Sequence, residues 1–249
     1  MTSRWPTFFR IAPLYTLLVI PAVAGTVSGK VELRDSRNSE VRNRRDYSSV
    51  VISLTPLPSS APAQKDAAAG LSQKHSTILQ KDKAFSPHVL AIPVGSFVDF
   101  PNLDPIFHNA FSSYSGQIFD VGLYPPGTTR SVRFTREGVV RVFCNIHSAM
   151  SAMIVVMATP YFAVTAHDGS FTLPDVPPGE YKLRVVHERS SDATLQALNR
   201  SITVGDDPLV LPVLGISEAG YLSIPHKNKF GQDYPPETGD HVMYPGTKR

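Results

Sequence analysis

Short stretches of alternating apolar and polar residues recur along this chain, and such alternation predicts half-buried β-strands. Near the start, Val27, Val31 and Leu33 fall on one face of a strand, and the apolar run 50–54 forms the next strand. Further strands are predicted at 85–92, 96–100, 119–122, 132–134, 139–143, 154–157, 170–173, 181–186, 201–204 and 209–213. Helical periodicity is scarce and proline is frequent, with 22 residues. The pattern therefore predicts an all-β protein with many turns.

Two stretches lack this alternation. Residues 58–80 are rich in proline, alanine, serine and lysine, which is typical of a linker. Residues 216–249 are rich in proline, glycine, lysine and histidine, and we expect them to form an extended tail. The predicted strands thus fall into three groups along the sequence, at 25–57, 81–158 and 159–215.

The first 24 residues have the layout of a signal peptide. Arg4 and Arg10 form a basic start, an apolar run follows, and Ala22-Val23-Ala24 is an A-x-A cleavage signal. Gly25 then begins the mature chain, which we expect to be periplasmic or secreted. An uncleaved membrane anchor is the alternative, although the apolar run is short for a span of about 20 residues. After cleavage no membrane insertion is expected.

Cleavage of the signal peptide would leave a mature chain that is close to neutral. Loss of its two arginines lowers the formal net charge from +3 to +1. No polybasic argument for binding nucleic acid or a membrane surface remains. The single cysteine cannot form an internal disulfide, and a free thiol is a liability in an oxidising compartment. We therefore expect Cys144 to be buried, paired with another chain or bound to a metal.

The segment around this cysteine combines three metal-binding side chains. Cys144, His147 and Met150 follow one another as C-x-x-H-x-x-M between two predicted strands. Thiolate, imidazole and thioether suit a copper ion that cycles between Cu(I) and Cu(II). An electron-transfer copper site needs a second imidazole, and His108 is the candidate because the chain can turn back through two or three strands after it. The sequence thus predicts one copper ion at His108, Cys144, His147 and Met150.

One ligand of this copper site has an alternative in the sequence, whereas other kinds of metal site fit these residues less well. Met153 can replace Met150 as the thioether, although its position suggests that it begins the next strand. A zinc site would need further cysteines or a closed set of four nitrogen and sulfur ligands. Oxygen reduction would need histidines beside Cys144, whose neighbours are Phe143 and Asn145. No catalytic residue is expected, and we do not expect an enzyme.

Residues 85–157 resemble the small blue copper proteins, the cupredoxin family of the plastocyanin and amicyanin type. The similarity is carried by 100–104, His108-Asn109, 138–144 and the loop 144–150. The short loop is most similar to that of amicyanin, whereas plastocyanin-type members have a longer one.

This resemblance implies a Greek-key β-sandwich that holds one type 1 copper ion. It implies that His108, Cys144 and His147 are the nitrogen and sulfur ligands, with Met150 as the axial ligand. Asn109 matches a family position that ties the two ligand-bearing loops together by hydrogen bonds, and such outer partners orient the ligands.

The residues that flank 81–158 resemble a second family, the carboxypeptidase regulatory-like (transthyretin-like) β-sandwich. The similarity is carried by 168–171, by 177–183, by Gly29-Lys30-Val31 and by the run 50–54. It implies a small Ig-like or transthyretin-like sandwich, made of 25–57 and 159–215, into which the copper domain is inserted. Three independent pieces in series are the alternative.

Two functions follow from these features. The first is an exported electron carrier with a weak, transient redox partner, such as a c-type cytochrome or an exported dehydrogenase. The second is a protein that stores or delivers copper, or uses copper to brace an interaction module, without redox duty. The second sandwich favours this alternative more than a bare blue copper domain would. An intense blue colour and a reversible potential would favour the carrier.

Overall fold

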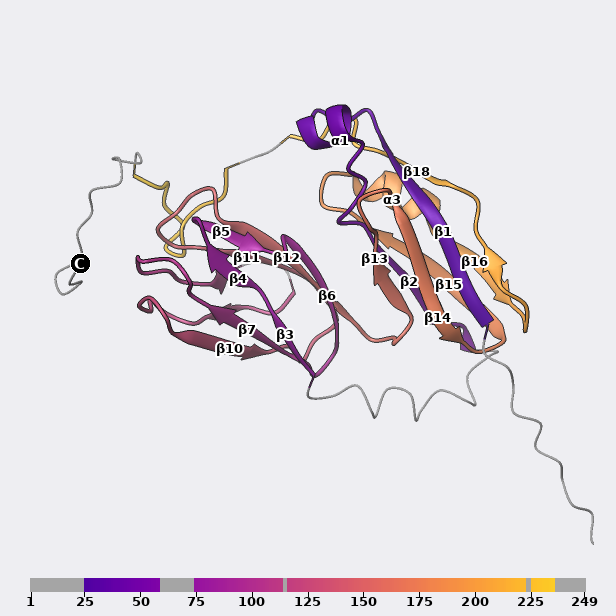
Figure 1. Cartoon of the computed structure of the whole chain (residues 1–249), viewed down its shortest axis with the longest axis horizontal. Helices are drawn as coiled ribbons and strands as arrows, with labels where there is room; N and C mark the ends of the chain where they lie inside the picture. Colours follow the sequence, from indigo (N-terminus) through magenta and orange to yellow (C-terminus); the bar gives the residue numbers. More distant parts are fainter. Residues whose placement is uncertain (1–24, 59–73, 114–115, 223–224, 236–249) are drawn as a thin grey trace, which may run out of the picture.

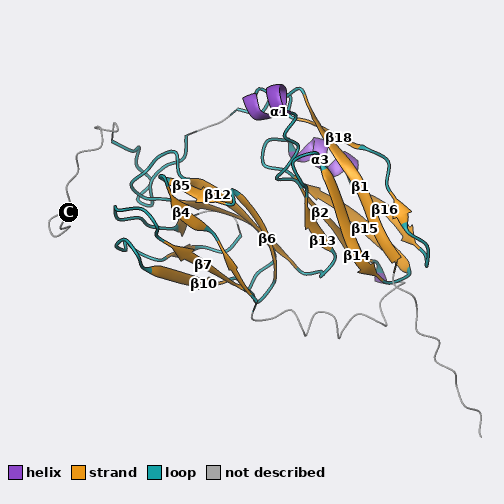
Figure 2. Ribbon diagram, in the orientation of Figure 1, coloured by secondary structure: helices purple, strands orange, loops and turns teal. Residues whose placement is uncertain are grey.

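The described chain is built mainly from β-strands, arranged as two modules of packed sheets (Figures 1 and 2). The computed structural model describes residues 25–58, 74–113, 116–222 and 225–235. The predicted signal peptide lies outside these residues. Within them, the helices α1 (Ser39–Arg44) and α3 (Asp192–Leu198) are short. The predicted all-β class is therefore confirmed. In this part of the chain no helix has the length and apolar character needed to cross a membrane.

The flanking module, residues 25–58 and 158–222, consists of two sheets that pack face to face. One sheet has the order β14-β1-β17, with β18 also paired to β1, and the other has the order β13-β2-β15-β16. Its strands are β1 (Gly25–Arg34), β2 (Val51–Pro56), β13 (Phe162–Val164), β14 (Ser170–Val176), β15 (Gly179–Val186), β16 (Arg200–Val204), β17 (Leu209–Val210) and β18 (Leu214–Ser217). Val27, Val31 and Leu33 are buried in its core, as their alternation predicts.

Strands from both ends of the chain share these sheets. β1 pairs antiparallel with β14 and parallel with β17 and β18. β2 pairs antiparallel with β13 and β15. The strands before residue 57 and those after residue 160 thus complete the same two sheets, and the strands between them in sequence form a module of their own.

The inserted module, residues 74–157, has a second hydrophobic core. Its sheets have the orders β6-β12-β11-β8-β9 and β10-β7-β3, and β4 and β5 form a separate hairpin. Its strands are β3 (His75–Thr77), β4 (Leu79–Lys81), β5 (Ala84–Ser86), β6 (Val89–Pro93), β7 (Phe97–Pro101), β8 (Phe111–Ser112), β9 (Phe119–Asp120), β10 (Thr129–Arg133), β11 (Gly138–Phe143) and β12 (Ser151–Met157). β11 pairs antiparallel with β12 along the whole length of β11, with Phe143 opposite Ser151. Residues 144–150 therefore form a tight connection at one end of this sheet.

β12 is buried on both faces, which explains its continuous apolar sequence. Because side chains alternate along a strand, Ala152, Ile154 and Val156 enter the core of the inserted module. Met153, Val155 and Met157 instead form a cluster with Val51 of the flanking module. This strand thus joins the cores of the two modules.

A histidine–carboxylate pair reinforces this junction. His88 Nε2 lies 2.5 Å from a carboxylate oxygen of Glu188, and His88 Nδ1 lies 3.0 Å from the carbonyl oxygen of Ser151. Both ring nitrogens face acceptors, which favours the doubly protonated, charged ring. The hydrogen bond to Glu188 raises the pKa of His88. Burial alone would raise the pKa of Glu188, but the contact with His88 outweighs it and the pKa is lowered. Arg141 also contacts Glu188, at 3.3 Å, and Arg189 lies within electrostatic reach.

Replacement of His88 by glutamine is expected to destabilise the protein in a pH-dependent way. The raised His88 pKa adds stability below about pH 6.5 that is lost as pH rises through the folded value. The lowered Glu188 pKa adds stability above about pH 4.5 that is lost as pH falls through its folded value. Unfolding of the wild type and of His88→Gln at about pH 5.5 and pH 8.5 measures the difference in their free energies of unfolding. We expect a larger difference at pH 5.5 than at pH 8.5, and below about 1 kcal/mol because His88 is partly exposed. An equal difference at both values would contradict a charged pair.

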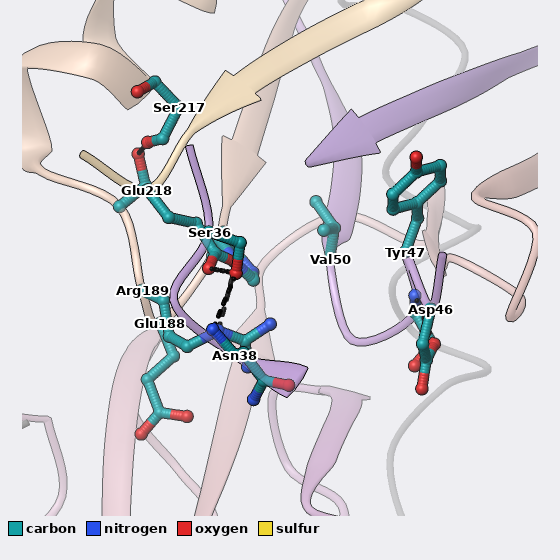
Figure 3. Close-up of polar contacts among 12 residues, drawn as sticks. Ser36, Asn38, Asp46, Tyr47, Val50, Glu188, Arg189, Ser217 and Glu218 are labelled. Carbon is teal, nitrogen blue, oxygen red and sulfur yellow. Dashed lines mark hydrogen bonds and ion pairs between the residues drawn. The ribbon is translucent and has the colours of Figure 1, made fainter. Parts of the chain in front are cut away.

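A buried carboxylate anchors the chain where it leaves the flanking module after β18. Glu218 Oε1 accepts hydrogen bonds from His187 Nε2 at 2.7 Å and Arg189 Nε at 3.0 Å. Its second oxygen accepts from Ser36 Oγ, which also accepts from the backbone N–H of Asn38 (Figure 3). A buried charge is tolerated when it is paired and hydrogen-bonded in this way. The end of β18 is therefore firmly held.

Several sequence-based expectations need correction. Residues 59–73 of the predicted linker 58–80 lie outside the described residues, and its end contains β3 and the start of β4. Ile78, between these strands, and Gln80 in β4 are buried, but their polar neighbours in sequence hide the strand signal. The predicted strand 85–92 is broken between β5 and β6 at Pro87, which lacks the N–H that a ladder needs.

Two regions for which the sequence predicts no strand also contain regular structure. The charged stretch 35–46 contains α1, whose first turn is capped by Asn38 Oδ1 accepting from the Glu40 N–H at 2.8 Å. The predicted tail 216–249 begins inside β18, which runs to Ser217. Residues 225–235 of this tail are not free either, because they pack against the inserted module.

Candidate metal centre

Two loops at one end of the inserted module bring the predicted ligands together. His108 lies between β7 and β8 and is held by a bridge to Tyr124, with backbone hydrogen bonds of 3.2 and 2.9 Å. Cys144 directly follows β11, and Met150 directly precedes β12. The loop between them is closed by hydrogen bonds from the Cys144 N–H to the Met150 carbonyl and from the Met150 N–H to the His147 carbonyl. β8 pairs with β11 at Phe111 and Phe143, which brings the two loops side by side.

The donor atoms of His108, Cys144 and His147 converge, and all lie within 4.8 Å of one another. Cys144 Sγ is 3.9 Å from His108 Nδ1 and 3.6 Å from His147 Nδ1. Metal bonds of about 2.3 Å to sulfur and about 2.0 Å to imidazole would separate these donors by roughly 3.5–3.7 Å. The two sulfur–nitrogen distances therefore fit one metal ion, and the two imidazoles would move closer together to share it. His108 and Cys144 are fully buried, and His147 is half-buried.

Asp104 fixes the orientation of His108. Its carboxylate accepts a hydrogen bond from His108 Nε2 at 2.7 Å, and both side chains are almost fully buried. Since Nε2 carries the proton, the lone pair of Nδ1 faces Cys144 Sγ. Burial lowers the pKa of His108, which favours this neutral ring. A carboxylate behind a ligating histidine also makes the ring a stronger donor.

The Asp104 carboxylate is itself tightly held. It accepts from the backbone N–H groups of Asp82 at 2.6 Å and Lys83 at 2.9 Å, in the turn between β4 and β5. Burial raises its pKa, but these hydrogen bonds and the one from His108 outweigh burial, so the pKa of Asp104 is lowered. The side chain is therefore a fixed negative charge next to the site.

The Cys144 thiol is buried, and backbone N–H groups surround its sulfur. Burial raises the pKa of Cys144, while the backbone N–H groups of Ile146, Asn109 and His147 act against that rise. A metal ion bound by Cys144 would supply a positive charge next to the sulfur and would favour loss of the thiol proton. Asn109 Oδ1 accepts from the backbone N–H of Asn145 at 3.1 Å, which ties the histidine loop to the cysteine loop. This is the role that the resemblance implies for Asn109.

The two methionine candidates lie on opposite sides of the sheet. Met150 is fully buried in the same cluster as Cys144. Met153 belongs to the cluster that faces the flanking module, together with Val155 and Met157. Of the two thioethers, only that of Met150 is thus on the side of the donor cluster.

Sequence reasoning missed several residues that support the site. Asp104 was noted only as part of the matching segment 100–104, although a carboxylate four residues before a candidate ligand is a recognisable signal. Tyr234 donates to the Cys144 carbonyl, and Lys229 contacts Asn145 and Asp120. These contacts come from the predicted tail, and no local pattern points to them.

Comparisons with known proteins give partial similarity to copper proteins. No family model and no curated protein sequence matches the chain. Among solved structures, a purple cupredoxin from Nitrosopumilus maritimus is 26% identical, with a TM-score of 0.31, over 33% of this chain and 99% of that one.

Two further solved structures are also similar to only part of the chain. A copper-containing nitrite reductase from Thermus scotoductus is 24% identical, with a TM-score of 0.33, over 41% of this chain and 28% of the reductase. A point variant of amicyanin in its Cu(I) state is 18% identical, with a TM-score of 0.32, over 36% of this chain and 89% of amicyanin. Each similarity covers less than half of the chain, so the chemistry of the site follows from its own residues.

Proposed function

We propose that this protein binds one copper ion at His108, Cys144 and His147, with Met150 as a weaker fourth ligand, and carries single electrons. The observation that carries this proposal is the convergence of a buried thiol with two imidazole nitrogens at 3.6 and 3.9 Å. Thiolate and thioether favour Cu(I), whereas imidazoles accept both oxidation states. Such a donor set supports a type 1 copper centre, with no bond chemistry of its own.

The supporting residues limit how far the ligands can move. Asp104 holds the His108 ring, and Asn109 fastens the histidine loop to the cysteine loop. The 144–150 loop is closed by its own backbone hydrogen bonds. Electron transfer is fast when the ligands rearrange little between oxidation states, and these contacts hold them in one arrangement.

His147 is the expected route for electrons to the surface. It is half-buried, whereas His108 and Cys144 are fully buried. Its neighbour Ile146 is exposed, and so are Leu103 beside Asp104 and Leu123 beside Tyr124. Small apolar contacts of this kind suit a weak, transient interface. We propose a c-type cytochrome or an exported dehydrogenase as the partner, in the periplasm or outside the cell.

Copper loading of the exported chain, followed by voltammetry and visible spectroscopy, tests the proposal. We expect one copper per chain, an intense thiolate-to-copper absorption band and a reversible one-electron wave. The zinc-loaded protein should show neither the band nor the wave. Tight binding of Cu(I) without a band or a reversible wave would contradict electron transfer and support copper storage or delivery.

A further inference from the structure

The C-terminal segment 225–235 lies against the inserted module, close to the cysteine loop. It is the yellow segment at the left of Figure 1, beyond the end of β18. Its contacts concentrate on Phe143, Cys144 and Asn145. The same chain is anchored at its other end by the buried Glu218 in the flanking module. The chain is therefore held at Glu218 in the flanking module and again within 225–235, beside the candidate metal site.

An aromatic pair fastens this segment to the cysteine. The Tyr234 hydroxyl donates to the Cys144 carbonyl oxygen at 2.6 Å. The His226 ring stacks on Phe143 with centroids 4.0 Å apart and packs edge-on against Tyr234. Because the single hydroxyl proton of Tyr234 goes to Cys144, His226 Nδ1 donates to the tyrosine oxygen, at 3.2 Å. Segment 225–235 thus contacts both the Phe143 ring and the backbone of Cys144.

Lys229 adds a second point of attachment. Its backbone N–H donates to Asn145 Oδ1 at 2.9 Å. Its ammonium group contacts Asp120 at 2.8 Å, and Asp120 also accepts from Asn109 Nδ2 at 2.7 Å. Since Asn109 accepts from the Asn145 N–H, the lysine completes a hydrogen-bonded ring around the two ligand loops.

The turn that presents Lys229 is ordered by its own contacts. Asn228 Oδ1 accepts from the backbone N–H groups of Phe230 at 2.9 Å and Gln232 at 3.0 Å. Gly231 adopts a positive φ of 76°, which glycine does without strain. A turn that is already folded loses less conformational entropy when it docks.

We propose that residues 225–235 form a clamp that holds the cysteine end of the ligand loop in its metal-binding position. His226, Lys229 and Tyr234 are its positioning residues. For copper, the clamp rests on the function proposed above. Its bonds reach the backbone of Cys144 and the side chain of Asn145, so loss of the clamp loosens the strand end that carries the sulfur. Without the clamp, the Cys144 thiol of the metal-free protein should react faster than in the wild type. Copper should also dissociate faster from the loaded protein.

The thiol of the metal-free protein gives a test that does not depend on copper. Cys144 is the only cysteine of the chain, so its alkylation rate reports on this one site. Tyr234→Phe removes one hydrogen bond and keeps the ring, and we expect the rate to rise about fivefold. The double variant Tyr234→Phe/Lys229→Ala should react faster still. In the copper-loaded protein, both variants should transfer Cu(I) to a chelator faster and show a shifted reduction potential.

A matched tyrosine separates the clamp from general destabilisation. The Tyr181 hydroxyl donates to the Pro177 carbonyl at 2.8 Å inside the flanking module. Tyr181→Phe therefore removes the same kind of bond, and it should lower the melting temperature without changing the alkylation rate. If the double variant reacts no faster than the wild type, the clamp is wrong. If the wild type binds no copper, the proposed function is wrong, and the alkylation rates still decide on the clamp.

Discussion

Cys144→Ser is expected to abolish the intense visible absorption of the copper-loaded protein and to lower its copper affinity by more than about 100-fold. The band requires a thiolate bound to copper, and serine cannot supply one. Loss of residues that merely support a ligand typically lowers metal affinity about 10–100-fold, so loss of the central ligand should exceed that range. Optical titration with Cu(II), and competition with a chelator for Cu(I), measure both quantities.

Two histidine variants, one at a proposed ligand and one away from the site, serve as comparisons for this result. His108→Ala removes a buried ligand and should also abolish the band. His75→Ala removes a histidine from β3 whose ring pairs with Asp99 at the surface, at 2.8 Å. This variant should keep full copper loading and colour. If Cys144→Ser and His108→Ala both keep the band, the ligand set is wrong.

Asp104→Asn is expected to weaken Cu(II) binding about 10–100-fold and to raise the reduction potential. The anionic carboxylate strengthens His108 as a donor and stabilises the higher charge of Cu(II) more than that of Cu(I). If the whole loss falls on Cu(II), the potential rises by about 60–120 mV, since each tenfold change in a one-electron equilibrium corresponds to about 59 mV. Voltammetry of the wild type and the variant measures this shift.

Asp99→Asn is the matched control. It removes a carboxylate of the same kind from a histidine, but His75 is more than half exposed and does not contribute to the donor cluster. We expect its potential to equal that of the wild type. A lowered or unchanged potential in Asp104→Asn would contradict the proposed influence of the carboxylate on His108.

Three of the four candidate ligands can be predicted from the sequence because they lie in one short loop. Cys144, His147 and Met150 lie within seven consecutive positions between two apolar strands, and the spacing alone suggests a curled metal loop. His108 required an assumption about topology, namely that the strands after it return the chain to the same end. The pairing of β8 with β11 provides that return.

Other parts of the site were hidden because their partners are distant in sequence. Tyr234 and Cys144 are 90 residues apart, and the composition around Tyr234 resembles an extended tail. The sequence does not decide between Met150 and Met153 for a different reason. β12 is apolar on both faces, so its residues do not reveal which face meets which core until the fold is known.

Copper K-edge X-ray absorption of the copper-loaded protein identifies the atoms that bind the metal. We expect one sulfur at a short distance, about 2.2–2.3 Å, and two imidazole nitrogens at about 2.0 Å. The short sulfur contribution should disappear in Cys144→Ser. A first shell made only of nitrogen and oxygen in the wild-type protein would contradict a copper ion held by His108, Cys144 and His147.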